Sequence, residues 1–283
     1  MADLVAFVLA AGADGCVYPG VASEVDTLTA DERAGMVAQL GTALRGCVPF
    51  VVGASADSAE ATIAHIEAGA RAGAVAAMVM APARLGDDVA AQTAHFAAIT
   101  AASPIPVMMQ NAPRPIGAGL APELVATVAA AVPGVVWVKE ETLPCGQNLT
   151  RISSAAGADI RGVFGGAGGR YITDELARGS LGTLPAAELT DLHARLVAAW
   201  NAGDATEARR LFMVSMPLLN FQAVFRMHMT KEVLRRRGVL RHTLVRGAGP
   251  RPDSGDLREL DALLDQIADE FRIYPVTREA AFS

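Results

Sequence analysis

Short apolar runs alternate with amphipathic segments along most of this chain. The runs that predict strands lie at residues 15–20, 48–55, 75–81, 107–112, 135–140, 160–165 and 182–186. Helical periodicity appears between them at residues 30–44, 58–72, 88–102, 121–131, 148–156 and 171–178. Strand–helix alternation repeated this often requires parallel strands joined by crossover helices. The pattern therefore predicts an α/β protein, either a barrel or a doubly wound sheet.

The last third of the chain has only helical patterns. Four helices are predicted at residues 189–203, 205–219, 227–237 and 257–271, and a Pro/Gly/Arg-rich connector at 247–255 precedes the last of them. We therefore predict two domains: residues 1–188 as the barrel and residues 189–283 as a helical region packed on it. The basic cluster Arg235-Arg236-Arg237 ends the third helix, where it complements the negative end of the helix dipole.

The predicted strand count does not close a barrel. Seven strands are predicted, and a helical segment at residues 4–11 precedes the first of them. A seven-stranded barrel leaves two edges without hydrogen-bonding partners. We expect about twenty residues, an average strand plus part of a helix, to be missing from this N-terminus, through a truncation or a misassigned start.

Composition excludes several classes of protein. The net charge of -6 provides no electrostatic footprint for nucleic acid. No apolar segment is long enough and free enough of breakers to span a bilayer, and the first residues lack the basic start of a signal peptide. The three cysteines and five histidines are scattered, so no metal or cofactor is predicted. We expect a reduced, cytoplasmic enzyme that forms a homodimer or homotetramer.

One lysine ends a strand that should be buried. Lys139 follows the apolar run 135–138 and precedes Glu140 and Glu141. Burial there favours the neutral amine, which is a nucleophile. Alternation places Trp137 and Lys139 on one face of the strand. A solvated lysine that ends the strand and pairs with Glu140 explains the local pattern equally well.

Three motifs occur in order between residues 4 and 240. They are residues 11–33, 106–113 and 136–140. They resemble the dihydrodipicolinate synthase/N-acetylneuraminate lyase family of Schiff-base (β/α)8 barrels, at its GTTGE loop, its PxxLYNxP strand and its IKE strand. The resemblance implies a TIM barrel, and it implies that Lys139 is the amine that condenses with the C2 carbonyl of a small 2-oxo acid.

The chain departs from this family at the residues that transfer protons. The usual catalytic tyrosine falls on Gln110, and the paired threonines of the GTTGE loop fall on Val21 and Ala22. The loop that often carries a second tyrosine has Ala83 and Arg84. The proton relay of the family is therefore absent, which disfavours dihydrodipicolinate synthesis.

One branch of the family matches better. Residues 23–24, 106–113, 217–220 and 230–234 resemble the 2-keto-3-deoxy sugar acid dehydratases. This resemblance implies dehydration or retro-aldol cleavage of a 2-keto-3-deoxy sugar acid. The alternatives are the aldol condensation of pyruvate, as in 4-hydroxy-tetrahydrodipicolinate synthase, and a catalytically dead barrel that binds a 2-oxo acid.

Two groups of residues after these strands are further candidates. Gln110 is predicted to position a water or a hydroxyl, and Asn111 either binds substrate or caps a loop. Gly165 and Gly166 either leave room for the sugar-acid chain or form a tight turn. Glu141 shares the parity of Lys139 and is a candidate base.

The loop after the first predicted strand is the candidate anchor for the substrate carboxylate. Ser23, or the backbone amides of Val21 and Ala22, would replace the family's threonines there. Glu24 is expected to brace this loop rather than to transfer protons.

Overall fold

The computed structural model describes residues 1–276. Internal contacts divide the chain into two compact units, which we call the helical unit (Met1–Asp14, Gly20–Arg33 and Pro185–Ser283) and the sheet unit (Gly15–Pro19 and Ala34–Leu184). The predicted domains, residues 1–188 and 189–283, stay a prediction. The helical unit combines two N-terminal segments with the C-terminal helices, so the two units are not separated at a single point in the sequence.

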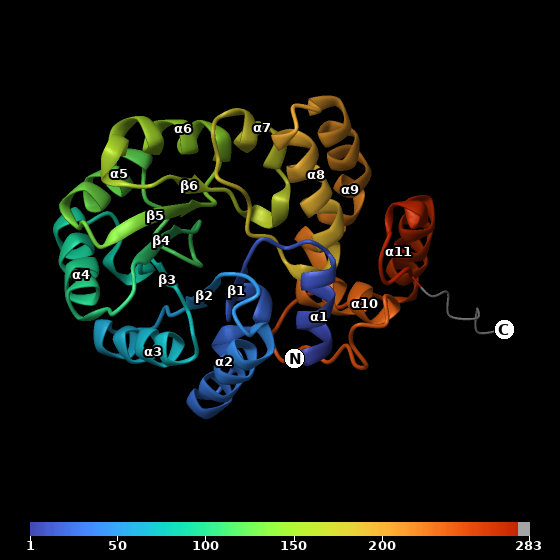
Figure 1. Cartoon of the computed structure of the whole chain (residues 1–283), viewed down its shortest axis with the longest axis horizontal. Helices are drawn as coiled ribbons and strands as arrows, with labels where there is room; N and C mark the ends of the chain where they lie inside the picture. Colours follow the sequence, from blue (N-terminus) through green and yellow to red (C-terminus); the bar gives the residue numbers. More distant parts are fainter. Residues whose placement is uncertain (277–283) are drawn as a thin grey trace. The chain divides into compact units, whose positions relative to one another are not determined.

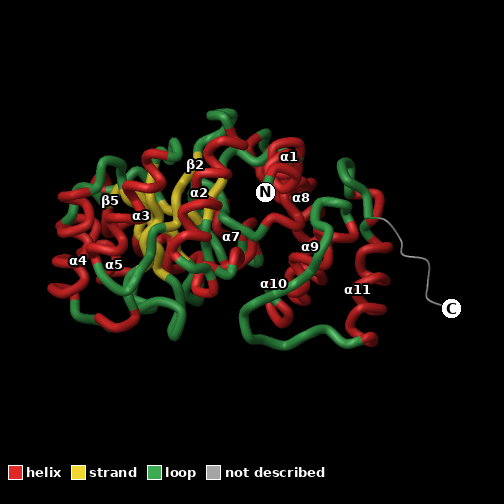
Figure 2. The backbone as a smooth tube through the Cα atoms, turned by 90° about the horizontal axis from the view of Figure 1, so that it is seen from below, coloured by secondary structure: helices red, strands yellow, loops and turns green. Residues whose placement is uncertain are grey.

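The sheet unit is built on six parallel strands that pair in sequence order. They are β1 (Cys16–Tyr18), β2 (Phe50–Gly53), β3 (Ala76–Met80), β4 (Val107–Asn111), β5 (Val135–Glu140) and β6 (Val163–Phe164). The crossover helices lie around the outside of this curled sheet (Figure 1): α3 (Ala59–Arg71), α4 (Val89–Ala102), α5 (Pro122–Ala131), α6 (Cys145–Ala156) and α7 (Ile172–Ala177). Figure 2 shows the strands enclosed between helices. Burial on both faces explains why the strands read as continuous apolar runs.

The seventh predicted strand is the main difference from the sequence-based expectation. Residues 182–186 form only an isolated bridge, between Gly165 and Thr183. Pro185 has no N–H to donate to a ladder, and Gly182 has a φ of 151°, which side-chain-bearing residues rarely adopt. The described residues therefore form a curled parallel α/β sheet of six strands, and the complete eight-stranded barrel is not seen among them.

Strand β5, which carries Lys139, has a bulge near its start. Val107 pairs with Val135, but Met108 pairs with Trp137, so one residue of β5 is extra. The guanidinium carbon of Arg161 lies over the indole of Trp137, 5.4 Å from the ring centroid. The cation that contacts this indole is therefore Arg161, whereas Lys139 is paired with Glu141.

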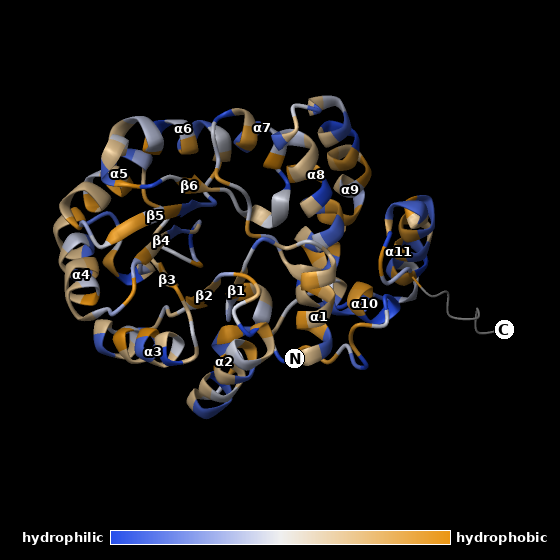
Figure 3. Ribbon diagram, viewed as in Figure 1, coloured by the Kyte–Doolittle hydropathy of each residue, from blue (hydrophilic) through white to orange (hydrophobic). Residues whose placement is uncertain are grey.

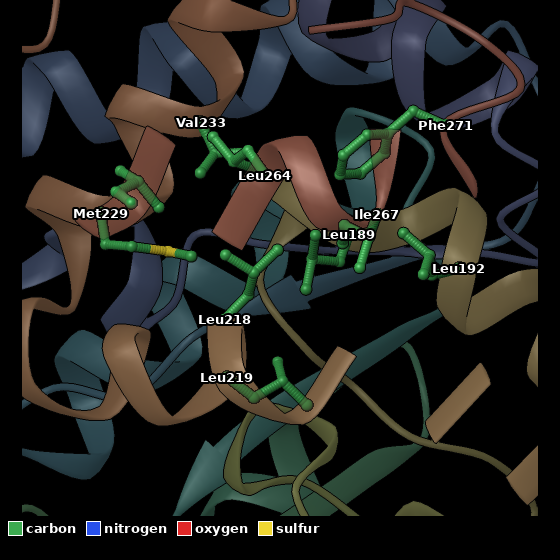
Figure 4. Close-up of a cluster of buried hydrophobic side chains, with 10 residues drawn as sticks. Leu189, Leu192, Leu218, Leu219, Met229, Val233, Leu264, Ile267 and Phe271 are labelled. Atoms are coloured by element: carbon green, nitrogen blue, oxygen red, sulfur yellow. The ribbon is translucent and has the colours of Figure 1, made fainter. Parts of the chain in front are cut away.

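The helical unit has its own apolar core. Its helices are α1 (Ala2–Ala10), α8 (Thr190–Asn201), α9 (Ala205–Phe225), α10 (Met227–Arg236) and α11 (Ser254–Gln266), and α2 (Ala30–Leu44) begins in this unit. One buried cluster joins residues from α8 to α11, including Leu192, Leu218, Val233 and Leu264 (Figure 4). Figure 3 shows that these helices mix hydrophobic and hydrophilic residues, whereas β5 is largely hydrophobic. Each helix therefore buries one face only.

The basic cluster at the end of α10 is a set of ion pairs. Arg235 and Arg236 both bind Glu232. The side chain of Arg237 is completely buried and bonds to Asp191 at 2.7 Å. These ion pairs are an additional role for the cluster, and its predicted interaction with the helix dipole stays a prediction.

Glu24 joins two distant segments of the helical unit. It adopts the left-handed conformation, with a φ of 54°, and its buried carboxylate binds the Lys231 ammonium. The backbone N–H groups of Arg246 and Gly247 donate to the same carboxylate at 2.7 and 2.8 Å. Burial raises the pKa of Glu24, but these donors outweigh it, and the pKa lies below its usual value. The expected bracing role of Glu24 therefore has a physical basis.

Within residues 1–276, no helix is long and apolar enough to cross a membrane. In the same described part of the chain, no group of three or more histidine, cysteine, aspartate or glutamate residues could hold a metal ion.

Candidate active site

Lys139 forms a buried cluster with Gln110 and Glu141 at the carboxyl ends of β4 and β5. Gln110 and Lys139 are register partners on these neighbouring strands. The Lys139 Nζ lies 3.3 Å from Glu141 Oε1, and the lysine side chain is 9% exposed. Gln110 Nε2 donates to Glu141 Oε2 at 2.6 Å. The buried amine is therefore paired with Glu141, two residues further along, and not with Glu140.

Glu141 is held in the carboxylate form by its surroundings. Burial raises its pKa, but the charge of Lys139 and hydrogen bonds from Gln110 and from the Ala167 N–H, at 3.1 Å, outweigh it. The pKa of Glu141 therefore lies below its usual value. A buried carboxylate in contact with a buried amine can exchange a proton with it.

Two consecutive glycines after β6 make room for two glutamates. A Cβ on Gly166 would lie 2.5 Å from Glu141 Cγ, and a Cβ on Gly165 would lie 2.0 Å from Glu175 Oε2. A larger residue at either position therefore requires a glutamate to move. The predicted role of these glycines in giving a substrate room stays a prediction.

Asn111 uses its side chain within the protein. Its Nδ2 donates to Glu140 Oε2 at 2.7 Å and to the Leu120 carbonyl at 3.0 Å, while Leu120 N donates to its Oδ1 at 2.9 Å. Glu140 Oε1 accepts from Thr142 N at 2.6 Å. Burial raises the pKa of Glu140 to about 7, although these hydrogen bonds oppose it. The bonds favour a loop-fixing role for Asn111, and its substrate role stays a prediction.

The candidate carboxylate anchor lies in the helical unit. Val21, Ala22 and Ser23 form a single 3-10 turn, η1 (Val21–Ser23), and Gly20 N lies 3.4 Å from Ser23 Oγ. Since Lys139 belongs to the sheet unit, the anchoring role of these residues stays a prediction from the sequence.

A comparison with known families identifies the chain. The sequence model of the dihydrodipicolinate synthetase family matches residues 1–266. The chain belongs to this family. The resemblance of the three sequence motifs is thereby confirmed, and so is the expectation that the protein is an enzyme of the lyase class.

Relatives in the family carry two kinds of name. The chain is 32% identical over 221 residues to the 4-hydroxy-tetrahydrodipicolinate synthase of Rhodospirillum centenum, covering 76% of this chain and 74% of that protein. It is 28% identical over 219 residues to the same enzyme of Maridesulfovibrio salexigens, with 76% and 74% covered. A putative mitochondrial 4-hydroxy-2-oxoglutarate aldolase of Coccidioides immitis is 29% identical over 184 residues, with 64% and 58% covered.

Solved structures of the family share the fold. YagE, a prophage protein of the dihydrodipicolinic acid synthase family from E. coli K12, solved in complex with pyruvate, superposes with a TM-score of 0.85. The two chains are 22% identical, and the match covers 94% of this chain and 91% of YagE. At this identity the likeness establishes the fold alone.

Sequence reasoning missed Glu175. This glutamate lies in α7 between Ile172 and Leu176, and all three are buried. The signal was present, because Ile172, Glu175 and Leu176 have the i, i+3, i+4 spacing of the buried face of a helix. Acidic residues are rarely fully buried, so a glutamate on this face indicates a special role.

Proposed function

We propose that this lyase uses Lys139 to form an imine with a 2-oxo acid, and that it dehydrates or cleaves a 2-keto-3-deoxy sugar acid. One observation carries the proposal: the Lys139 amine lies 3.3 Å from the Glu141 carboxylate, and Gln110, at the position of the family's tyrosine, bonds to the same carboxylate. We infer that Glu141 performs the proton transfers for which other members of the family use the tyrosine.

Imine formation needs a neutral amine. Glu141 takes a proton from the Lys139 ammonium, and the amine then attacks the C2 carbonyl carbon. One proton passes from the attacking nitrogen to the C2 oxygen, Glu141 returns the other, and the C2–oxygen bond breaks with loss of water. The protonated imine that results draws electrons from C3.

The same carboxylate serves the second stage. In dehydration, Glu141 takes a proton from C3 and the electron pair moves toward the imine nitrogen; Glu141 then gives this proton to the C4 hydroxyl, and the C4–oxygen bond breaks with release of water. In cleavage, the proton is taken from the C4 hydroxyl and the C3–C4 bond breaks. The Gln110 amide is neither acid nor base at neutral pH, so its part is to orient Glu141 or the substrate hydroxyl. Ser23 and the amides of Val21 and Ala22 are proposed to bind the carboxylate.

Borohydride reduction with pyruvate tests the proposal. The wild type should gain the mass of the reduced pyruvate adduct, and peptide mapping should locate it on Lys139. The Lys139→Met variant is the control and should gain none. No adduct at saturating pyruvate would overturn the proposal and favour a barrel that only binds 2-oxo acids.

The product then distinguishes the reactions. A semialdehyde of unchanged carbon count indicates dehydration of the keto-deoxy acid, and release of pyruvate indicates cleavage. Condensation of pyruvate with an aldehyde is the second candidate, because several relatives carry the name 4-hydroxy-tetrahydrodipicolinate synthase. We also propose a homodimer or homotetramer, although one similar structure is described as a monomeric synthase variant.

A further inference from the structure

Glu175 is a buried acid whose carboxyl makes no hydrogen bond of normal geometry. The residue is 1% exposed, and neither carboxyl oxygen makes a hydrogen bond of normal geometry, although the Gly166 N–H lies close enough to oppose the effect of burial on its pKa. An unpartnered buried carboxylate is very costly, whereas a neutral carboxylic acid loses far less on burial. The surroundings of Glu175 therefore favour its neutral form.

This acid supports the turn that holds Glu141. The Glu175 carboxyl lies over Gly165, where a Cβ would come within 2.0 Å of an oxygen, and Glu141 lies against Gly166. The next residue, Ala167, donates its N–H to Glu141 at 3.1 Å. The turn 165–167 thus has one glutamate against each of its two glycines.

The charged groups around Glu175 are mostly acidic. On its own helix, Asp174 is paired with Arg178 at 2.9 Å. Glu140 and Glu141, at the end of β5, and the buried Cys145 thiol, at the start of α6, are close enough to interact with it electrostatically. Burial raises the pKa of Glu175 to about 7; the Gly166 N–H opposes this rise, and the charges of Asp174, Glu141 and Glu140 add to it.

We propose that Glu175 is a positioning residue, which as a neutral acid keeps the turn 165–167 in the conformation that holds Glu141. When Glu175 loses its proton, the carboxylate must gain water or move, and either change displaces the Gly165 backbone beneath it. The Ala167 N–H then no longer holds Glu141 beside Lys139. This inference rests on the proposed acid–base role of Glu141.

The Glu175→Gln variant tests the proposal, because it has nearly the same shape and cannot ionise. Expected is an unchanged kcat at pH 6 and a ratio of variant to wild-type kcat that rises about tenfold by pH 8, as for one group that ionises near pH 7. KM should change little, since Glu175 is not proposed to bind substrate. A ratio that stays constant with pH would overturn the proposal.

The pH dependence of unfolding provides a readout that needs no activity. The folded state binds the Glu175 proton more tightly than the unfolded state, so wild-type stability should fall relative to Glu175→Gln as pH rises from about 4.5 to about 7. If no imine forms on Lys139, the proposed function fails, but this measurement still reports on the buried acid. An identical pH dependence in both proteins would contradict the neutral state of Glu175.

A single and a double variant test the contact between Gly165 and Glu175 and distinguish its loss from general misfolding. Gly165→Ala should unfold at lower denaturant concentration and lose activity, because its Cβ would overlap the Glu175 carboxyl. The double variant Gly165→Ala/Glu175→Ala removes that overlap and should recover most of the loss. Absence of recovery would show that Glu175 does not support this turn.

Discussion

At the residue scale, the chemistry depends on which acid the buried lysine meets. Lys139, Glu140 and Glu141 are consecutive, and strand alternation sends Glu140 to the opposite face from the other two. Glu140 is bound by Asn111 and Thr142, whereas Glu141 meets the amine. Burial raises the pKa of Glu140 to about 7, while the pKa of Glu141 lies below its usual value. The two adjacent carboxyls therefore differ in their partners and in the direction of their pKa shifts, and Glu141 is the one that contacts the amine.

Removing the charge of Glu141 should separate binding from chemistry. We expect Glu141→Gln to lower kcat by about 10²–10⁴-fold, the usual contribution of a general base. Pyruvate should still be trapped on Lys139 by borohydride at long incubation, because the amine is retained. Steady-state kinetics and intact-protein mass spectrometry measure both effects.

Glu123→Gln is the matched control, because Glu123 is an exposed carboxylate paired with Arg151 at 2.7 Å. It should leave kcat unchanged. Wild-type kcat in Glu141→Gln would rule out the proposed proton carrier.

At the element scale, capping residues set the limits of helices, and in α11 the cap lies before the apolar pattern begins. The apolar pattern predicted a helix at residues 257–271, but α11 spans Ser254–Gln266. Asp253 forms a capping box with Asp256 and accepts hydrogen bonds from Gly255 N and Asp256 N at 2.7 and 2.9 Å. This acidic pair, three residues apart, was present in the sequence as a start signal. The cap lies outside the apolar pattern, so periodicity alone placed the helix too late.

Loss of this cap should destabilise the helical unit. Asp253→Ala leaves two N–H groups of the first turn without their acceptor, and we expect it to lower the free energy of unfolding by about 1 kcal/mol. Ser254→Ala, at the next position, makes no side-chain cap and is the control. Urea unfolding followed by circular dichroism measures the difference. Equal midpoints for the two variants would contradict the role of the cap.

At the scale of the whole molecule, contacts between distant segments build the helical unit. Arg237 lies between the rings of Phe7 and Phe271, at 4.7 and 4.4 Å, and bonds to Asp191 and to the Glu188 carbonyl. It therefore ties together α1, α8 and the segment that follows α11. Glu24 and Lys231 connect a second pair of segments in the same unit.

Arg237→Met should be strongly destabilising, because it leaves the carboxylate of Asp191 buried without a cation. Breaking one partner of a buried pair costs about 3–5 kcal/mol. The neighbouring Arg235→Met removes a more exposed pair with Glu232 and should cost at most about 1 kcal/mol. Chemical unfolding of both variants measures this contrast. A similar loss in the two would show that Arg237 is not the central contact.

The sequence by itself determined the family and the parallel strands joined by helices. Parity along the strand already linked Glu141 to Lys139, whereas the pairing of Gln110 with Lys139 came from the strand register, which includes a bulge that no motif predicted. These inferences succeed because backbone periodicity is local.

Only the tertiary structure decided which charges are buried and what they meet. Glu24 with Lys231 and Arg237 with Phe7 join residues far apart in the chain, and Glu175 lies over Gly165 across the turn between β6 and α7. The reduction of residues 182–186 to a single bridge also depended on the neighbouring strand end. The physical reason is common to all four: the free energy of a charge or an edge depends on its desolvation and its partners, and these are set by the packing of distant segments.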